Sequence, residues 1–395
     1  MSLRLRHAAV ALSIVVTACG EDPSGPALPD EQATASAVAA PAFVQVSGGA
    51  GHSCGLSAAG AAWCWGHNEA GQLGTSDLSS RLLPAPVTGS HTFRQISAGG
   101  TYTCAIATDD RVWCWGGNFN GQLGDGTVER RTAPTAVATT LRFQSVSTGS
   151  GSEHTCAIGT DRLAYCWGAG YDGELGDGTR GFRTVPGPVS GDRHWRQISA
   201  GYTHTCGITA GRVLLCWGAD DEGQLGDGPD LLRKVRPKRV AGGRLYDRVS
   251  AGILRSCAVS TEGQAFCWGA GELGQIGDGG MVSRSVPTKV AGTRSWRNIS
   301  AVGTNHTCAE TSVGKVLCWG INDYGALGDG TTDSHARPAA VSGAFTFIQM
   351  ASGVDQTCAV VASGAAYCWG SNEGGQVGDG TSRNIRTAPT RVGGS

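Results

Sequence analysis

A cysteine pair that returns about every fifty residues constrains the fold more than any other feature. In its clearest copy, His204-Thr205-Cys206 is followed by nine residues and then by Cys216-Trp217-Gly218. Successive copies are 50 to 52 residues apart. A period this regular is typical of repeat architectures, in which one supersecondary unit is stacked many times. The seven pairs are Cys54 with Cys64, Cys104 with Cys114, Cys156 with Cys166, Cys206 with Cys216, Cys257 with Cys267, Cys308 with Cys318, and Cys358 with Cys368.

Each unit contains four short segments with the alternation of half-buried strands. The first reads aromatic-x-x-[Ile/Val]-Ser, the second T-C-A-I, the third V-x-C-W-G and the fourth P-x-x-V, as in Pro134 to Val137. No segment has a sustained helical period. Four strands per unit, repeated radially, are typical of a β-propeller. We therefore predict an all-β, seven-bladed propeller over residues 42–395, with four strands per blade.

The tryptophan of each C-W-G is expected to lie in the core between blades, because aromatic side chains bury a large apolar area. A ring of tryptophans that stack on carbohydrate is the alternative. Ring closure needs a further device. We expect the strand around Val392 to complete the blade formed by the N-terminal strands.

The paired cysteines are predicted to form seven disulfides, one within each blade. The second and third strands form a hairpin whose turn lies midway between the two cysteines, so that the cysteines face each other. Such a pair has Cα atoms about 4.5 Å apart, within the roughly 4.4–6.8 Å range of disulfides. Metal binding is the alternative, but zinc sites favour close spacings such as C-x2-C. We expect no metal and no cofactor.

The N-terminus has the features of an export signal. Residues 1–19 contain Arg4 and Arg6, a short apolar run, and the sequence Val16-Thr17-Ala18-Cys19, which resembles a bacterial lipobox with Cys19 as the lipidated residue. An ordinary secretory signal with a chance cysteine is the alternative. Residues 20–41 have the composition of a flexible linker. Both interpretations predict an exported protein, periplasmic or on the cell surface, where disulfides persist.

The repeat resembles that of the regulator of chromosome condensation (RCC1) family, here in an exported bacterial lipoprotein. The matching residues include Asn118 to Gly126 (N-F-N-G-Q-L-G-D-G), Gly223 to Gly228 and Cys318-Trp319-Gly320, and the resemblance covers about residues 43–395. Three positions depart from it: Thr75 replaces an aspartate, and Ile276 and Val377 replace a leucine.

The resemblance implies a seven-bladed propeller and leaves the activity open. The founding member is a guanine-nucleotide exchange factor that acts through a wedge inserted in one blade. Here the nearly constant repeat length leaves no room for a wedge, so an exchange-factor function is less favoured. A secreted bacterial propeller of this repeat family inhibits β-lactamases through one face, and this analogy favours protein binding.

Binding is expected on the face formed by the connections between the third and fourth strands, which are long. They hold 19 of the 32 acidic residues. Their constant part, G-Q-L-G-D-G-T, predicts Asp-Gly turns at Asp125, Asp177 and Asp329; a calcium site is the alternative. Their variable part follows each C-W-G and mixes acidic with aromatic residues, as in interface hot spots. The predicted partner-binding residues are Glu69, Phe119, Tyr171, Asp172, Asp220, Asp221, Glu222, Glu272, Asp323, Tyr324 and Glu373.

Two other positions recur around the repeats. An arginine three residues before the proline of the fourth segment is expected to pair with a turn aspartate. A histidine two residues before the first cysteine is expected to form structural hydrogen bonds, with metal binding or pH sensing as the alternative. These histidines are His52, His154, His204 and His306.

No nucleophile–base arrangement or phosphate-binding glycine loop is apparent in the sequence, so we do not expect an enzyme. The net charge of −1 gives no general attraction to nucleic acid. We predict a monomeric, envelope-anchored module that binds an envelope or extracellular protein and contacts the membrane only through its N-terminal lipid. The alternatives are an inhibitor of a secreted enzyme and a protein that binds envelope polysaccharide.

Overall fold

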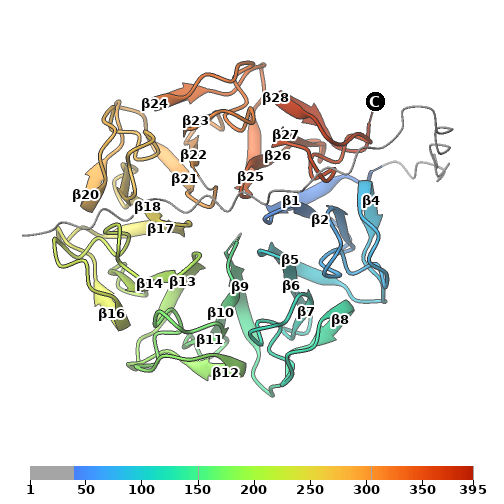
Figure 1. The fold of residues 1–395 in the computed structure, drawn as a ribbon, viewed down its shortest axis with the longest axis horizontal. Helices are drawn as coiled ribbons and strands as arrows, with labels where there is room; N and C mark the ends of the chain where they lie inside the picture. The colour runs from blue at the N-terminus through green and yellow to red at the C-terminus, as the bar shows by residue number, and fades with distance from the viewer. Residues whose placement is uncertain (1–39, 150, 304, 395) are drawn as a thin grey trace, which may run out of the picture. The chain divides into compact units, whose positions relative to one another are not determined.

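The computed structural model describes residues 40–149, 151–303 and 305–394. They form seven four-stranded antiparallel sheets, and within every sheet the strands lie side by side in chain order. The sheets are arranged around a centre as the blades of a propeller (Figure 1). The described residues contain no helix. The predicted all-β, seven-bladed fold is confirmed, whereas residues 1–19, Cys19 and most of the predicted linker lie outside the described part.

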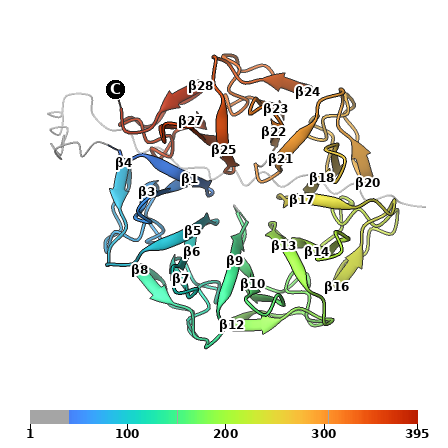
Figure 2. The same ribbon diagram turned by 180° about the vertical axis from the view of Figure 1, so that it is seen from behind.

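The first strand of each blade lies closest to the centre, and first strands of neighbouring blades contact one another (Figures 1 and 2). These strands are β1 (Phe43–Gly48), β5 (Phe93–Ala98), β9 (Phe143–Thr148), β13 (Trp195–Ala200), β17 (Tyr246–Ala251), β21 (Trp296–Ser300) and β25 (Phe347–Ser352). The second strands are β2 (His52–Ser57), β6 (Tyr102–Ala107), β10 (His154–Gly159), β14 (His204–Thr209), β18 (Arg255–Ser260), β22 (His306–Thr311) and β26 (Gln356–Val361).

The third and fourth strands follow outward. The third strands are β3 (Ala62–Gly66), β7 (Val112–Gly116), β11 (Ala164–Gly168), β15 (Leu214–Gly218), β19 (Ala265–Gly269), β23 (Val316–Gly320) and β27 (Ala366–Ser371). The fourth strands are β4 (Arg81–Pro86), β8 (Arg131–Ala136), β12 (Arg183–Pro188), β16 (Lys234–Arg239), β20 (Arg284–Lys289), β24 (His335–Ala340) and β28 (Ile385–Arg391).

The predicted bounds of the fourth strand were wrong. In the second blade this strand starts at Arg131, three residues before the expected Pro134, and it ends at Ala136, before Val137. Proline has no N–H to donate, but an edge strand tolerates it because one side of the strand has no partner. The strand therefore runs through its proline, and the arginine belongs to the strand.

All seven predicted disulfides are present, each between facing residues of the second and third strands. The Cα atoms are 4.1 Å apart in every pair, slightly closer than the predicted separation. Seven disulfides indicate an oxidising compartment, such as the extracellular space. The bonds join Cys54 with Cys64, Cys104 with Cys114, Cys156 with Cys166, Cys206 with Cys216, Cys257 with Cys267, Cys308 with Cys318, and Cys358 with Cys368.

None of the described segments is a helix that could span a membrane.

The C-W-G tryptophans lie between blades, as predicted, and all seven are fully buried. Each ring N–H donates to a backbone carbonyl in the long loop of the preceding blade. The indole of Trp115 donates to the carbonyl of Gln72 at 2.9 Å, and that of Trp217 to Glu174 at 2.9 Å. The tryptophan therefore contributes both apolar area and one directed hydrogen bond to every interface.

The predicted mode of ring closure was wrong. β28 pairs with β27 inside its own blade, so the two ends of the described chain lie in different blades. The last blade joins the first through the contacts used at other interfaces. Trp65 donates to the carbonyl of Gln376 at 2.9 Å. Val392 packs in one buried cluster with Phe43. Because each repeat forms a whole blade, contacts between two complete blades close the ring rather than a shared sheet. Backbone groups take part as well as side chains, since the Phe43 N–H donates to the Gly364 carbonyl at 2.7 Å.

Candidate functional site

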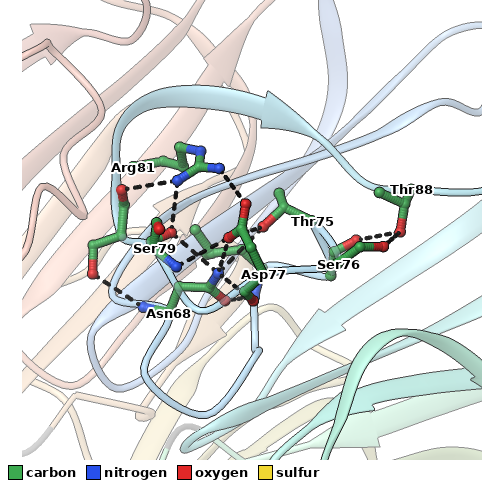
Figure 3. Close-up of polar contacts among 10 residues, drawn as sticks. Asn68, Thr75, Ser76, Asp77, Ser79, Arg81 and Thr88 are labelled. Carbon is green, nitrogen blue, oxygen red and sulfur yellow. Dashed lines mark hydrogen bonds and ion pairs between the residues drawn. The ribbon is translucent and has the colours of Figure 1, made fainter. Parts of the chain in front are cut away.

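In four of the seven blades, the long loop between the third and fourth strands is held by a buried asparagine, shown for the first blade in Figure 3. The side-chain oxygen of Asn68 accepts the backbone N–H of Leu73 at 2.9 Å. Its nitrogen donates to the Asp77 carboxylate and to the Ser79 carbonyl, both at 3.1 Å. One side chain thus ties the start of the loop to its end. The equivalent residues in three other blades are Asn118, Asn322 and Asn372.

A cation on the fourth strand clamps the turn aspartate, as predicted. In the second blade, Arg131 lies 2.7 Å from the Asp125 carboxylate. Burial alone would raise the pKa of Asp125, but hydrogen bonds from Thr127 and Arg131 hold it below its usual value. These donors occupy the carboxylate, which favours the turn interpretation over a calcium site there. The other ion pairs are Arg81–Asp77, Arg183–Asp177, Lys234–Asp227, Arg284–Asp278 and Arg386–Asp379. In the sixth blade the Nε2 atom of His335 takes this place, 2.8 Å from the Asp329 carboxylate.

The first blade departs from this arrangement without losing the clamp. Thr75 stands where other blades have the aspartate. Asp77, two residues further on, supplies the carboxylate to Arg81 at 2.6 Å instead (Figure 3). The hydroxyl of Thr75 donates to the same carboxylate at 3.0 Å. The clamp is therefore maintained by a compensating residue within the same loop.

Most of the predicted partner-binding residues lie exposed at the loop tips. The aromatic side chains of Phe119, Tyr171 and Tyr324 are 80%, 51% and 48% exposed. These are large values for rings of this size. Five carboxylates of this set are also exposed and form no ion pair within the described part of the chain: Glu69, Asp221, Glu272, Asp323 and Glu373.

Two predicted residues are half-buried because they contact the next blade. Asp172 forms an ion pair with Arg233 at 2.6 Å. Glu222 accepts a hydrogen bond from the Ser283 hydroxyl at 3.4 Å. The tips of neighbouring blades are therefore linked into a continuous surface.

Asp220 does not belong to this surface, and its inclusion was wrong. It is 1% exposed and occupies the position of the buried asparagine. Its Oδ1 accepts the backbone N–H of Leu225 at 2.8 Å, the bond that Asn68 makes to Leu73. The sequence pattern A-D-D-E shows two adjacent aspartates as equals, but the loop turns one inward and leaves Asp221 outward.

A second exposed group on the same loops was not predicted from the sequence. These side chains are apolar and follow the Asp-Gly turn, and each is at least 43% exposed: Val128, Phe182, Leu231, Leu232, Met281 and Val282. The positions after the Asp-Gly turn vary between repeats, and this variability is the signal that could have found them. Exposed apolar side chains beside charged ones favour contact with a protein surface.

A pocket of about 240 Å³ opens on this face in the fifth blade. Leu254 and Leu273 contribute apolar surface, and Glu222 and Glu272 contribute carboxylates. An acidic pocket with apolar walls fits a lysine or arginine side chain, whose stem is apolar and whose head is cationic.

The histidines before the first cysteines are buried and structural, as expected. The Nε2 atom of His154 lies 2.8 Å from the Thr205 hydroxyl of the next blade. Complete burial lowers the pKa of His52, His154, His204 and His306 to about 3, so all four are neutral at physiological pH. No group of three or more metal-binding side chains occurs among the described residues.

Comparison with known proteins gives the family. Profiles of the "Regulator of chromosome condensation (RCC1) repeat" match residues 59–106, 109–158, 163–208, 262–309 and 313–360. A second profile of the same description matches 43–72, 93–122, 195–224 and 296–326. Together the matches cover well over half of the chain.

Curated relatives match over part of their length. The ultraviolet-B receptor UVR8 of Arabidopsis thaliana is 33% identical over 210 residues, which are 51% of this chain and 48% of that protein. The human E3 ubiquitin-protein ligase HERC2 is 30% identical over 200 residues, 49% of this chain and 4% of the ligase. The chain therefore spans about half of UVR8 and a small part of HERC2.

Solved structures show the same fold. Prp20p from Saccharomyces cerevisiae superimposes with a TM-score of 0.74 at 21% identity, covering 85% of this chain and 87% of that one. Human WBSCR16 gives a TM-score of 0.72 at 22% identity, covering 80% and 85%. The profile matches, the repeat geometry and these likenesses agree: the chain belongs to the regulator of chromosome condensation (RCC1) repeat family.

Proposed function

We propose that this propeller is a non-enzymatic module that binds a protein partner through its long-loop face. The main support for the proposal is that each long loop combines repeated internal contacts with an exposed tip whose residues vary. The clamped aspartate and the buried tryptophan occur in every blade and the asparagine in four, whereas the pair of residues after the asparagine position differs in each blade. Variable exposed residues on a fixed scaffold are the usual arrangement of a binding surface.

The composition of the tips defines the kind of partner. Exposed carboxylates lie among exposed aromatic and apolar side chains. Aromatic anchors supply most of the binding energy in protein interfaces, and complementary charge sets orientation and association rate. We infer a partner with a basic rim around an apolar patch. Prp20p has binding properties to Gsp1p and histones, so a protein of this fold binds other proteins.

We further propose that the protein is exported and anchored by a lipid on Cys19, in the periplasm or on the cell surface. The seven disulfides support an oxidising compartment. The test is fractionation of cells that express the wild type or the Cys19→Ser variant. We expect the wild type in the membrane fraction and the variant in soluble form. Equal partitioning of both would contradict the lipid anchor.

Partner binding is tested by affinity capture from an envelope extract, with the oxidised protein as bait. The test variant carries Phe119→Ala, Tyr171→Ala and Tyr324→Ala, which remove exposed rings without disturbing the core. The control variant carries Arg248→Ala and Val313→Ala on the opposite face, where Arg248 lines a hollow of about 490 Å³. Any captured protein is then purified and mixed with the propeller at a one-to-one ratio, so that its binding to each variant can be measured.

We expect the test variant to weaken binding of the purified partner at least 100-fold, since each anchor contributes about 1–2 kcal/mol. The control variant should bind like the wild type. Loss of binding in the control alone would place the working surface on the opposite face. If only polysaccharide is retained, and the three rings are needed for it, the glycan alternative replaces protein binding.

A further inference from the structure

The slot filled by the buried asparagine is rich in oxygen atoms. In the first blade the Asn68 nitrogen lies within 3.1 to 3.2 Å of four oxygens: the Thr75 hydroxyl, the Asp77 carbonyl, the Asp77 carboxylate and the Ser79 carbonyl (Figure 3). Only a hydrogen-bond donor or a cation can sit at the centre of such a group, because oxygen atoms without a shared proton or cation repel one another.

Two blades fill the slot with backbone. Gly170 and Gly271 replace the asparagine in the third and fifth blades. A Cβ on Gly170 would lie 1.9 Å from the carbonyl oxygen of Gly181, and one on Gly271 would lie 2.2 Å from that of Val282. The outer part of each loop therefore closes over the glycine, and no side chain fits between.

The fourth blade does neither, because Asp220 puts a carboxylate where four blades have an amide. Its Oδ1 keeps the bond to the Leu225 N–H at 2.8 Å. Its Oδ2 therefore takes the place of the donating nitrogen. Among the described residues this buried oxygen has no hydrogen-bond donor, and neither has Oδ1 of Asp227, the turn aspartate of the same loop. Two carboxylate oxygens of one loop are thus buried, each lacking a donor, and the Asp220 and Asp227 side chains lie within hydrogen-bonding range of each other.

A second substitution in the same loop explains why the turn aspartate lacks its donors. In the second blade the Thr127 N–H and hydroxyl both donate to Oδ1 of Asp125, at 3.0 and 2.7 Å. Pro229 occupies the position of this threonine in the fourth blade. Proline has neither an N–H nor a hydroxyl group. The fourth blade has therefore exchanged three donors of the slot, the amide nitrogen included, for groups that cannot donate when Asp220 is ionised.

The neighbouring cation, Lys234, contacts the other oxygen of the turn aspartate. Lys234 lies 3.7 Å from Oδ2 of Asp227 and 3.0 Å from Asp230, so the two orphaned oxygens remain unsatisfied. The loop is also the most acidic of the seven, with five of their 19 carboxylates.

We propose that the slot in the fourth blade binds a hard divalent cation of the Ca²⁺ type, which replaces the amide nitrogen of the other blades. Asp220 Oδ2 and Asp227 Oδ1 would be its charged ligands. The carbonyl of Pro229 would be a third ligand, since it lies nine residues after the slot residue, as the Thr331 carbonyl does after Asn322. Solvent water would complete the shell. Ca²⁺ takes six to eight oxygen ligands, and so few charged ligands correspond to an affinity of about 10⁻⁴–10⁻³ M.

The experiment is calorimetric titration of the full, oxidised protein with CaCl₂, together with thermal unfolding in EDTA and in 5 mM CaCl₂ (about ten times the expected dissociation constant). The key variant is Asp220→Asn, which restores the residue of four other blades and so preserves the fold. The matched control is Asp221→Asn, which removes the same charge from the adjacent exposed residue.

We expect the wild type and the Asp221→Asn variant to bind one Ca²⁺ per chain and to unfold at a higher temperature with Ca²⁺. The Asp220→Asn variant should be more stable than the wild type in EDTA and should not respond to Ca²⁺. A wild type that ignores Ca²⁺ would overturn the proposal and leave a shared proton between the two aspartates. A response that persists in Asp220→Asn would place the ion elsewhere and would also overturn it.

Discussion

At the residue scale, one position of the repeat shows how replacing an amide with a carboxyl group makes stability depend on pH. Gln122 accepts the N–H of Asn120 through its side chain at 2.9 Å, and its carbonyl accepts the indole of Trp167. Glu174 makes the same two contacts in the third blade, to the Asp172 N–H and to Trp217. Burial of the carboxyl group raises the pKa of Glu174 to about 7.

The first prediction concerns Glu174→Gln. Because the folded-state pKa lies above the unfolded value, the wild type is most stable below pH 4.5 with respect to this group. It loses that stability as the pH rises through about 7. The loss is at most about 3.5 kcal/mol, because the pKa rises from 4.5 to about 7 and each pKa unit corresponds to about 1.4 kcal/mol. Urea unfolding at pH 5 and pH 8 should show that the variant gains on the wild type at pH 8. An equal difference at both pH values would contradict the assignment.

The second prediction concerns the buried histidines, whose lowered pKa has the opposite effect on how stability changes with pH. Their folded-state pKa of about 3 lies below the unfolded value of 6.5, so stability is complete above pH 6.5 and falls as the pH decreases. His204→Gln should reduce the slope of unfolding free energy against pH by up to about 1.4 kcal/mol per pH unit. Gln356 occupies the equivalent position and donates to the Gly49 carbonyl at 3.1 Å, so the substitution fits. Parallel stability curves between pH 6 and pH 4 would be the contrary result.

At the scale of the element, each blade is a short antiparallel sheet whose central hairpin is cross-linked. The Cys206–Cys216 bond joins β14 and β15 at facing positions. The hairpin already holds its two strands together, so the cross-link removes less unfolded-state entropy than its loop length suggests.

The third prediction is that the double variant Cys206→Ala and Cys216→Ala loses about 1–3 kcal/mol of unfolding free energy and keeps the fold. Because all seven disulfides share the same register and Cα separation, the equivalent change at Cys308 and Cys318 should cost a similar amount. Urea unfolding of both variants measures this. A loss in one blade several times that in the other would show that the blades are not equivalent.

At the scale of the whole molecule, the joint between the last and first blades is built like the other joints. Gln349 exchanges two hydrogen bonds with Val46, of 2.9 and 3.0 Å. Gln95 and Val146 make the same exchange inside the ring. Gly393 lies against Ala40, so the ends of the described chain are adjacent. The contacts that stabilise the ring therefore do not depend on which joint holds the two ends of the described chain.

The fourth prediction is that a circular permutant folds. The new chain is built from residues 40–394. It starts at Asp192 and ends at Gly191, in the turn between β12 and β13, and a short Gly/Ser linker joins residue 394 to residue 40. Its unfolding free energy should lie within about 1 kcal/mol of the wild-type value, because closure entropy varies slowly with loop length. Thermal unfolding followed by circular dichroism measures it. Loss of the cooperative transition would show that the joint at Trp65 is weaker than the others.

The sequence alone determined the blade, because its information is local and is repeated seven times. The facing cysteines, the buried tryptophans and the aspartate clamp all follow from spacing within one unit or from the period. What depends on contacts between distant units was decided only by the tertiary structure. The closure at Val392 was mispredicted, since complete repeats allow two ways of forming the ring. Asp220 and Asp221 are equivalent in sequence, and only the path of the folded loop turns one of them into the oxygen-lined slot and the other into solvent.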